Sequence, residues 1–382
     1  MRALAVTALT ALLALGCSRA QQRPLALWVL AEGSERTLES PEKIAQLVAR
    51  AHELGATDLF VQVHRAGRSW FPSTHADDAP YRAIRAAHPD APAPLADVIA
   101  RAHAKGIRVH AWFNCLALAQ NRDAPVLAKL GRDAVQVDRA GRNLLDYPPD
   151  GKVPPPDGNY FELDTPGLWL DPAVPGVVEY LSDTVGDLAA AAPDLDGLHL
   201  DYIRYPFALP MVPGSRFRGL DFGYGDTAKA RFAEQRGGKP FEAGDEWDAF
   251  RRARVGDVVA ALRERKPKAW QLSAAVLAYA DRAYLTSLQD WRAWLDDGRL
   301  DFAVAMAYTR DDALLRYMAH SLRFGVGGDH VWLGLGSWLV IDDPTRLARQ
   351  LALARDVDPA GISLFSYDAL AAKPESFAAL EK

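Results

Sequence analysis

The stretch LDGLHLDYIRYP, residues 195–206, is apolar on alternate positions and ends in a carboxylate, an arginine and two tyrosines. Leu198 and Leu200 share one face of the expected strand, because side chains two residues apart lie on the same side. His199 and Asp201 share the other face. If the leucines face helices, the histidine and the carboxylate point toward the centre of the fold. The stretch therefore predicts a buried strand that ends in a polar site.

Seven further short apolar runs accompany this strand, and helix-like amphipathic segments separate most of them. The runs are residues 25–33, 58–64, 107–114, 270–277, 300–308, 331–336 and 361–367. Regular alternation of strand and helix predicts parallel strands joined by helical crossovers, and eight such units predict a single α/β (β/α)8 TIM barrel. A doubly wound open sheet is the alternative. It is disfavoured because no glycine-rich phosphate loop follows any of the runs.

Two connections are far longer than the usual few residues. One follows the third run, from Cys115 to about Asp171, and the other follows the fourth, from Tyr202 to about Gly244. Loops that follow strands of a (β/α)8 barrel lie on its C-terminal face, where active sites are built. The sequence therefore predicts that these long loops form the walls of a cleft.

The first seventeen residues have the pattern of an export signal: Arg2, an apolar run too short to span a membrane, and small residues before Cys17. The ending ALGC resembles a bacterial lipobox, which predicts that Cys17 is lipidated and that residues 1–17 are a lipoprotein signal peptide. Cleavage by an ordinary signal peptidase is the alternative. Ser18 in place of an aspartate predicts outer-membrane sorting. Residues 18–24 are then a short linker, and residues 25–382 form the catalytic domain.

Composition excludes some classes of partner. The formal net charge is −5 and no lysine or arginine run occurs, which argues against nucleic acid, because phosphate binding needs a basic stripe. With Cys17 as the lipid site, only Cys115 remains, so no internal disulfide can form. We expect Cys115 to be a small buried apolar residue.

Several neighbouring runs end with polar or aromatic side chains on the face expected to point inward. On the third run these are His110, Trp112 and Asn114, and on the others His64, Tyr308 and Tyr367. Burying such groups without partners costs roughly 1–3 kcal/mol each, so the set as a whole predicts a site. Any single histidine taken alone fits a hydrogen-bonded core residue better. For Asp201 the structural alternative is an ion pair with Arg204.

Six motifs resemble, in order, those of the glycosyl-hydrolase-like family 10 group of exported bacterial (β/α)8 proteins. They are VHAWFN (109–114), GLWLDP (167–172), DGLHLDYIRYP (196–206), SAAVLAYADRAY (273–284), QDWRAWLDDGRLDFAVAMAYTRDD (289–312) and GISLFSY (361–367). The resemblance extends from about Leu25 to Tyr367. It implies hydrolysis of glycosidic bonds in cell-envelope glycans, and some members are similar in being outer-membrane lipoproteins that act on peptidoglycan strands stripped of their peptides.

The resemblance also implies that Asp201 is the catalytic carboxylate. The family often has a second acidic residue directly after it, and here that position is Tyr202. Glycoside hydrolysis normally needs two carboxylates, about 5–5.5 Å apart for retention of configuration and about 6.5–9.5 Å apart for inversion. Asp281 and Asp311, beyond the fifth and sixth strands, are the candidate partners. Asp311 fits a helix N-cap equally well.

The predicted substrate-binding set combines stacking and hydrogen-bonding side chains. It comprises His64, His110, Trp112, Asn114, His199, Arg204, Tyr205, Tyr308 and Tyr367. A zinc hydrolase in which His64, His110 and His199 gather around the metal is one alternative. A glycan-binding protein on a degenerate barrel is another. We expect a glycan partner, a membrane contact through the lipid, and no cofactor or metal.

Overall fold

The computed structural model describes residues 23–210, 220–239 and 241–380. The predicted signal peptide, Cys17 and residues 18–22 lie outside the described residues, so these predictions stay predictions. No helix within the described part of the chain is long and apolar enough to cross a membrane.

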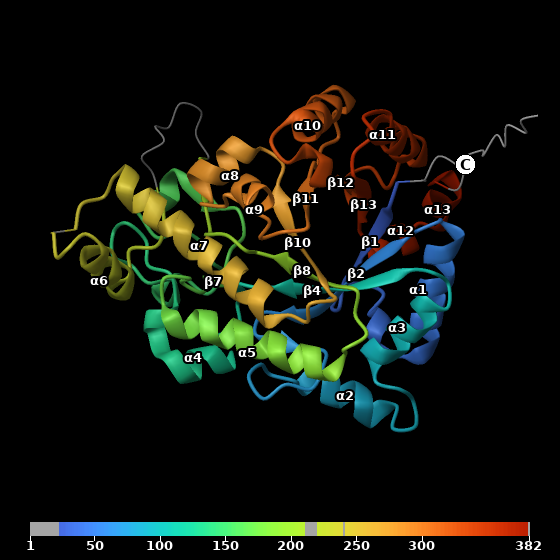
Figure 1. Cartoon of the computed structure of the whole chain (residues 1–382), viewed down its shortest axis with the longest axis horizontal. Helices are drawn as coiled ribbons and strands as arrows, with labels where there is room; N and C mark the ends of the chain where they lie inside the picture. The colour runs from blue at the N-terminus through green and yellow to red at the C-terminus, as the bar shows by residue number, and fades with distance from the viewer. Residues whose placement is uncertain (1–22, 211–219, 240, 381–382) are drawn as a thin grey trace, which may run out of the picture.

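Eight parallel strands form a closed ring in the described chain, and this confirms the (β/α)8 barrel (Figure 1). In order around the ring they are β1 (Leu25–Val29), β2 (Asp58–Arg65), β4 (Arg108–Asn114), β8 (Gly197–Asp201), β10 (Gln271–Leu277), β11 (Phe302–Met306), β12 (Val331–Gly336) and β13 (Gly361–Phe365). The ring closes because β1 pairs with both β2 and β13. A doubly wound sheet would leave two open edges, so that alternative is wrong.

Helices cover the outside of the ring. Those that follow the strands as crossovers are α1 (Pro41–Glu53), α3 (Pro94–His103), α5 (Pro175–Ala191), α7 (Asp245–Arg265), α9 (Trp291–Asp296), α10 (Asp312–Phe324), α11 (Pro344–Asp356) and α13 (Pro374–Leu380). The additional helices are α2 (Ala79–Ala87), α4 (Pro125–Leu130), α6 (Asp226–Gln235), α8 (Ala280–Thr286) and α12 (Tyr367–Ala371). Helix α1 has a well-formed N-terminus, because the Ser40 hydroxyl accepts a hydrogen bond from the amide of Lys43 (3.3 Å) and Pro41 occupies its first position.

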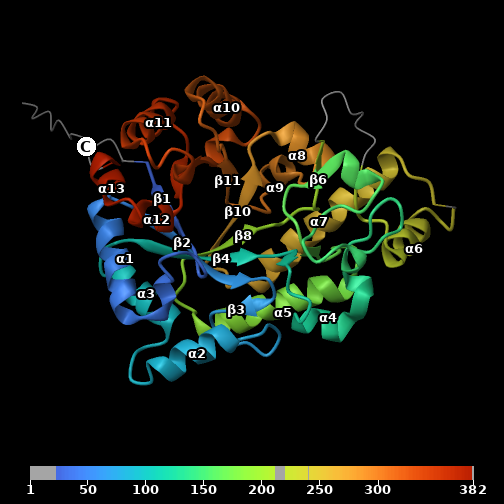
Figure 2. The ribbon, with the colours of Figure 1, turned by 180° about the vertical axis from the view of Figure 1, so that it is seen from behind.

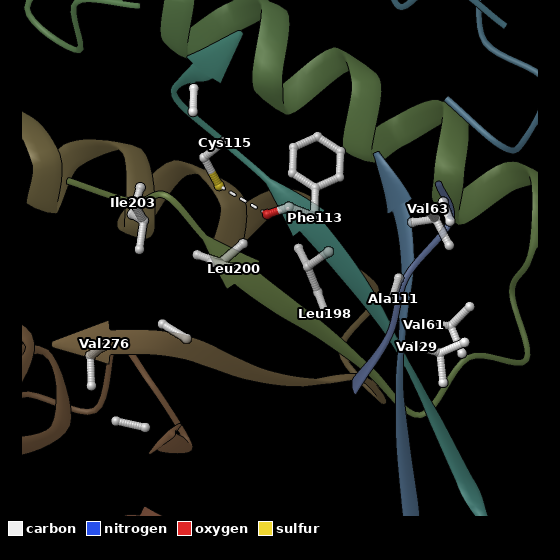
Figure 3. Close-up of a cluster of buried hydrophobic side chains, with 14 of the residues drawn as sticks. Val29, Val61, Val63, Ala111, Phe113, Cys115, Leu198, Leu200, Ile203 and Val276 are labelled. Carbon is white, nitrogen blue, oxygen red and sulfur yellow. Dashed lines mark hydrogen bonds between the residues drawn. The ribbon is translucent and has the colours of Figure 1, made fainter. Parts of the chain in front are cut away.

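The outward faces of the strands supply the apolar layer under the helices. Figure 3 shows Leu198 and Leu200 of β8 in this layer beside Phe113 of β4, as the alternation in the sequence predicts. Cys115 belongs to the same layer and is buried, with its thiol near the carbonyl oxygen of Phe113 (3.5 Å). The expectation that this cysteine is a small core residue is therefore confirmed.

The inside of the ring is filled mainly by aromatic side chains. The interior cluster comprises Ala26, Trp28, Phe60, Trp112, Ala275, Phe302, Val304 and Trp332. The rings of Phe302 and Trp332 stack with their centroids 4.6 Å apart. The barrel is therefore a packed core, and a ligand has access only at its ends.

The two long connections are folded together on one side of the barrel. The first contains β5 (Ala117–Ala119), β6 (Phe161–Leu163) and β7 (Leu168–Trp169), and the second contains β9 (Ala208–Pro210). Strand β6 pairs antiparallel with β9, which joins the two loops directly. Figures 1 and 2 show these loops and α6 at the end of the barrel away from the start of the described chain. The predicted long loops on the C-terminal face are confirmed.

Candidate active site

Asp201 is the last residue of β8 and stands at the C-terminal end of the barrel. Its Oδ2 accepts a hydrogen bond from the indole Nε1 of Trp112 on the neighbouring strand (3.0 Å), and its Oδ1 accepts one from the backbone amide of Tyr202 (2.7 Å). Strands β4 and β8 pair in register, so that Asn114 lies opposite Asp201. These contacts hold the carboxylate in one orientation at the mouth of the ring.

Burial raises the pKa of Asp201 above its usual range. The Tyr202 amide, the charge of Arg204 and the Trp112 indole oppose this effect, because each of them stabilises the ionised form. A carboxyl with a raised pKa holds its proton to higher pH, as a general acid requires.

Tyr202 is the residue that follows Asp201, and its backbone is left-handed, with a φ of 49°. This conformation is uncommon for a bulky side chain and marks a sharp turn at the end of the strand. The turn takes the chain out of β8 and into the second long loop.

Arg204 is buried under three aromatic rings. Its guanidinium carbon lies 4.9 Å from the ring centroid of Trp169, 5.4 Å from that of Tyr202 and 5.1 Å from that of Phe207. Its ion-pair partner is Asp164, a residue of the first long loop, at 3.3 Å. The alternative that Arg204 forms an ion pair with Asp201 is therefore wrong, although its charge still acts on that carboxyl.

Two further carboxylates lie in this region, and the sequence analysis did not propose either. Asp164 is tied to Arg204, and Glu32, just beyond β1, pairs with Arg65 (3.5 Å) and Arg68 (3.0 Å). The charges of Arg65 and Asp164 both act on the phenol of Tyr202. Asp164 and the ion pair of Arg65 with Glu32 are therefore both near Tyr202. Glu32 could have been found by applying the strand-end rule to the first run. Nothing in the local sequence distinguishes Asp164.

Asn114 and Tyr308 are placed at the same end of the barrel as Asp201. The side-chain oxygen of Asn114 accepts a hydrogen bond from Nε2 of Gln62 (3.4 Å). The ring of Tyr308 lies 5.8 Å from that of Phe365, and burial together with the negative charge of Asp201 raises the pKa of its phenol. Trp112, Asn114, Arg204 and Tyr308 are thus the predicted binding residues that the structure brings to Asp201.

His110 and His199 do face the barrel axis, but both lie below the mouth as fully buried core residues. Nε2 of His110 contacts Oδ1 of Asp58 at 2.8 Å. Nε2 of His199 accepts a hydrogen bond from the Trp28 indole (3.1 Å), so its Nδ1 carries the proton and donates to Ser273 Oγ (2.8 Å). Burial lowers the pKa of His199 well below its usual value, so this imidazole is neutral. The structure therefore does not bring these histidines to the mouth, since their hydrogen-bonding partners are inside the core, and a role for them in substrate binding stays a prediction.

His64 faces the opposite way from the prediction. The pairing of β2 with β4 shifts by one residue between Gln62 and His64, and this bulge turns His64 to the helix side of the strand. Its ring stacks on Phe113 (4.2 Å), and its nitrogens contact the Asn114 carbonyl oxygen (2.8 Å) and the Tyr180 hydroxyl of α5 (3.4 Å). The expected direction of His64 is therefore wrong, and its role in substrate binding stays a prediction.

Tyr205 and Tyr367 are also buried away from the mouth. The hydroxyl of Tyr205 points to Asp171 under the long loops (3.4 Å). Strand β13 ends at Phe365 and α12 begins at Tyr367, so the strand alternation does not extend to this tyrosine. Its ring packs against Phe377 of α13. The structure does not bring either tyrosine to Asp201, and a binding role for them stays a prediction.

Asp281 and Asp311 are exposed and make no hydrogen bond or ion pair with the residues around Asp201, as far as the described chain shows. Oδ1 of Asp311 accepts hydrogen bonds from the amides of Ala313 (2.8 Å) and Leu314 (3.1 Å). This residue is therefore the N-cap of α10, which was the alternative to a catalytic role. Asp281 lies in the first turn of α8. A catalytic role for either stays a prediction.

The three histidines considered for zinc do not converge, since His64 faces α5 while His110 and His199 bind separate partners. No group of three or more histidine, cysteine, aspartate or glutamate side chains within the described ranges is arranged to hold a metal ion.

The family model for glycosyl hydrolase-like 10 matches residues 25–315, from β1 into α10. The chain belongs to the glycosyl hydrolase-like 10 family. The match contains Asp201, Trp112, Arg204 and Asp164, so it includes the mouth of the barrel described above. No curated protein sequence is significantly similar to this member of the family.

Solved structures similar to this glycosyl hydrolase-like 10 protein include two domains of glycan-acting enzymes. The PgaB (BpsB) glycoside hydrolase domain from Bordetella bronchiseptica superposes with a TM-score of 0.65 at 16% identity, with 94% of this chain and 98% of that chain covered. The catalytic domain of beta-amylase from Paenibacillus polymyxa gives a TM-score of 0.56 at 11% identity, with 91% and 93% covered. At these identities the likeness establishes the shared fold.

Proposed function

We propose that this protein is a glycoside hydrolase in which Asp201 is the general acid. The observation that supports this most strongly is a carboxyl group of raised pKa, held by Trp112 at the C-terminal end of β8, in a barrel of the glycosyl hydrolase-like 10 family. In (β/α)8 enzymes the catalytic residues stand at this end of the strands.

In the proposed reaction the protonated Asp201 donates its proton to the glycosidic oxygen as the bond to the anomeric carbon breaks. The Trp112 indole and the Tyr202 amide then stabilise the carboxylate that remains. Their hydrogen bonds also orient the carboxyl, so that proton transfer requires little rearrangement of the side chain.

The reaction needs a second carboxylate that stays ionised, and Asp164 is the candidate we favour. It forms an ion pair with Arg204, and the charge of Arg204 also acts on Asp201, so the same arginine interacts with both carboxyl groups. Glu32, which forms ion pairs with Arg65 and Arg68, is a second candidate. The anomeric configuration of the first product, measured by NMR, shows whether the second carboxylate acts as a nucleophile or as a base that activates water.

For the substrate we propose a polysaccharide of the bacterial cell envelope, with peptide-free peptidoglycan strands as the first choice. The support is the export signal and lipobox that end at Cys17, together with the family resemblance of the motifs around Asp201. In this proposal Cys17 is lipidated and anchors the protein in the cell envelope, in the outer membrane facing the periplasm.

A glycan-binding protein that does not cleave its ligand is the second candidate. The observation that favours it is Tyr202 in the position where the family often has an acidic residue, so that two adjacent carboxylates are absent. Trp112, Tyr308 and Arg204 would still hold sugar in this case.

The test is incubation of the chain lacking residues 1–17 with peptide-free peptidoglycan strands, with mass spectrometry of the products and Asp201→Asn in parallel. Cleavage by the wild type alone supports the hydrolase, and the product ends identify the linkage. Binding without cleavage by both proteins supports the second candidate. If neither protein binds or cleaves the strands, the proposed glycan is contradicted. The wild type and Asp201→Asn are then assayed on other envelope polysaccharides.

A further inference from the structure

Helix α10 carries an exposed apolar face. Tyr317 and Phe324 are spaced seven residues apart with His320 between them, so the three lie on one side of the helix. Tyr317 is 69% exposed, Phe324 72%, and Val326, just beyond the helix, 63%. The ring of His320 stacks on that of Phe324, with centroids 5.8 Å apart. We call Tyr317, His320, Phe324 and Val326 the α10 patch.

Phe324 and Val326 of the α10 patch lie toward the N-terminal end of the barrel, because α10 ends at Phe324 shortly before β12 begins at Val331. Both nitrogens of the Arg23 fork bind the Asp358 carboxylate at 2.6 Å, and Arg323 Nε donates to the Asp358 backbone oxygen at 2.9 Å. Arg323 is also a cation over the ring of Phe324. Arg23 is therefore linked through Asp358 to Arg323, which contacts Phe324 of the α10 patch.

The distance from this point to the lipidation motif is short. Cys17 precedes Arg23 by six residues, and an extended chain spans at most about 3.3–3.6 Å per residue, or roughly 20 Å in total. A lipid on Cys17 would hold the N-terminal end of the barrel within that distance of the bilayer. The opposite end of the barrel, with Asp201, would be the end farther from the tether.

We propose that the α10 patch is a membrane-contact surface that rests in the headgroup region of the bilayer to which Cys17 is anchored. Transfer of phenylalanine, tyrosine and valine side chains from water into the headgroup region lowers the free energy, and aromatic rings favour the interface. Arg316 on α10 adds a positive charge suited to anionic headgroups. Because these side chains lie along one side of α10, a helix on the outside of the ring, the contact lays that side of the barrel on the bilayer and leaves the mouth with Asp201 uncovered.

This inference depends on the proposed lipidation of Cys17 and is independent of the proposed hydrolysis. Its test uses the lipidated mature protein in vesicles of phosphatidylethanolamine and phosphatidylglycerol. Val326→Cys carries a polarity-sensitive fluorophore, and the control label is at Leu285→Cys on α8, which is similarly exposed at 67%. Cys115 is buried, and protein without an added cysteine gives the background.

We expect the emission of the label at residue 326 to shift to the blue on reconstitution and to be quenched at least threefold more by headgroup-depth nitroxide lipids than the label at residue 285. Adding Phe324→Glu should return the label at residue 326 to the aqueous value, whereas Tyr284→Glu, on α8, should not. Phe324 is mostly exposed, so its replacement should leave the thermal midpoint unchanged.

Equal quenching at the two labelled positions would overturn the proposal. So would a mature protein whose mass shows no lipid on Cys17, because the tether would then be absent. Absence of glycan cleavage would count against the proposed hydrolase alone, since none of these readouts depends on turnover.

Discussion

Replacing Trp112 with phenylalanine tests the control of the Asp201 pKa. The change removes the indole N–H that donates to Asp201 Oδ2 at 3.0 Å and keeps an aromatic ring beside Phe365. A hydrogen bond to a charged group contributes about 1.5–3 kcal/mol, and one pKa unit corresponds to about 1.36 kcal/mol. Because this donor stabilises the ionised form, its loss should raise the pKa of Asp201 by about 1–2 units.

The assay is the release of reducing ends from the cleaved glycan, measured as kcat/KM from pH 4 to pH 9. A general acid must be protonated in the free enzyme, so its pKa sets the pH at which activity declines on the alkaline side. In Trp112→Phe this alkaline limb should move to higher pH by about 1–2 units. Trp332 also lies inside the barrel but does not contact Asp201, so Trp332→Phe should leave the alkaline limb in place. An unmoved limb in Trp112→Phe, or an equal shift in both variants, would refute the reasoning.

Three further predictions concern other residues of the barrel. Burial lowers the pKa of His64 to about 4, so the folded state loses stability as pH falls from about 6.5 to 4, by about 3 kcal/mol; His64→Gln should remove this acid sensitivity in urea unfolding and leave KM unchanged. Burial raises the pKa of Asp171 to about 6, so stability falls by about 3 kcal/mol as pH rises from about 4 to 6; Asp171→Asn should be flat over that range, and an equal decline in the variant would contradict the assignment. Trp338, half exposed directly after β12, should stack on substrate, so Trp338→Ala should raise KM about 2- to 10-fold with kcat unchanged, whereas a fall in kcat alone would contradict this role.

The strand order and the direction of most side chains could be predicted because one face of each strand must meet the helices. The leucines of β8 determine the direction of Asp201 in this way, and the same rule places Trp112 correctly on β4. The rule failed at His64, because a bulge in β2 adds one residue to the pairing and reverses the alternation beyond it. It also failed at Tyr367, where the strand has already ended.

Depth along the barrel axis could not be predicted from periodicity. His110 and Trp112 share a face of β4, yet the first binds Asp58 inside the core and the second binds Asp201 at the mouth. Which level a residue occupies depends on the stagger between strands, which the sequence does not display. Asp164 reaches the site through the pairing of β6 with β9, a contact between loops that are far apart in the chain.

The proposed role of Asp201 as the general acid is tested by measuring turnover in a matched pair of variants. Asp201→Asn and Asp311→Asn each replace one carboxylate with an amide of the same shape, and asparagine still serves as the N-cap that residue 311 provides to α10. We expect Asp201→Asn to lose about 10²- to 10⁴-fold in kcat while glycan binding is kept, and Asp311→Asn to stay close to the wild type. Activity of Asp201→Asn within a few-fold of the wild type would contradict the proposed role.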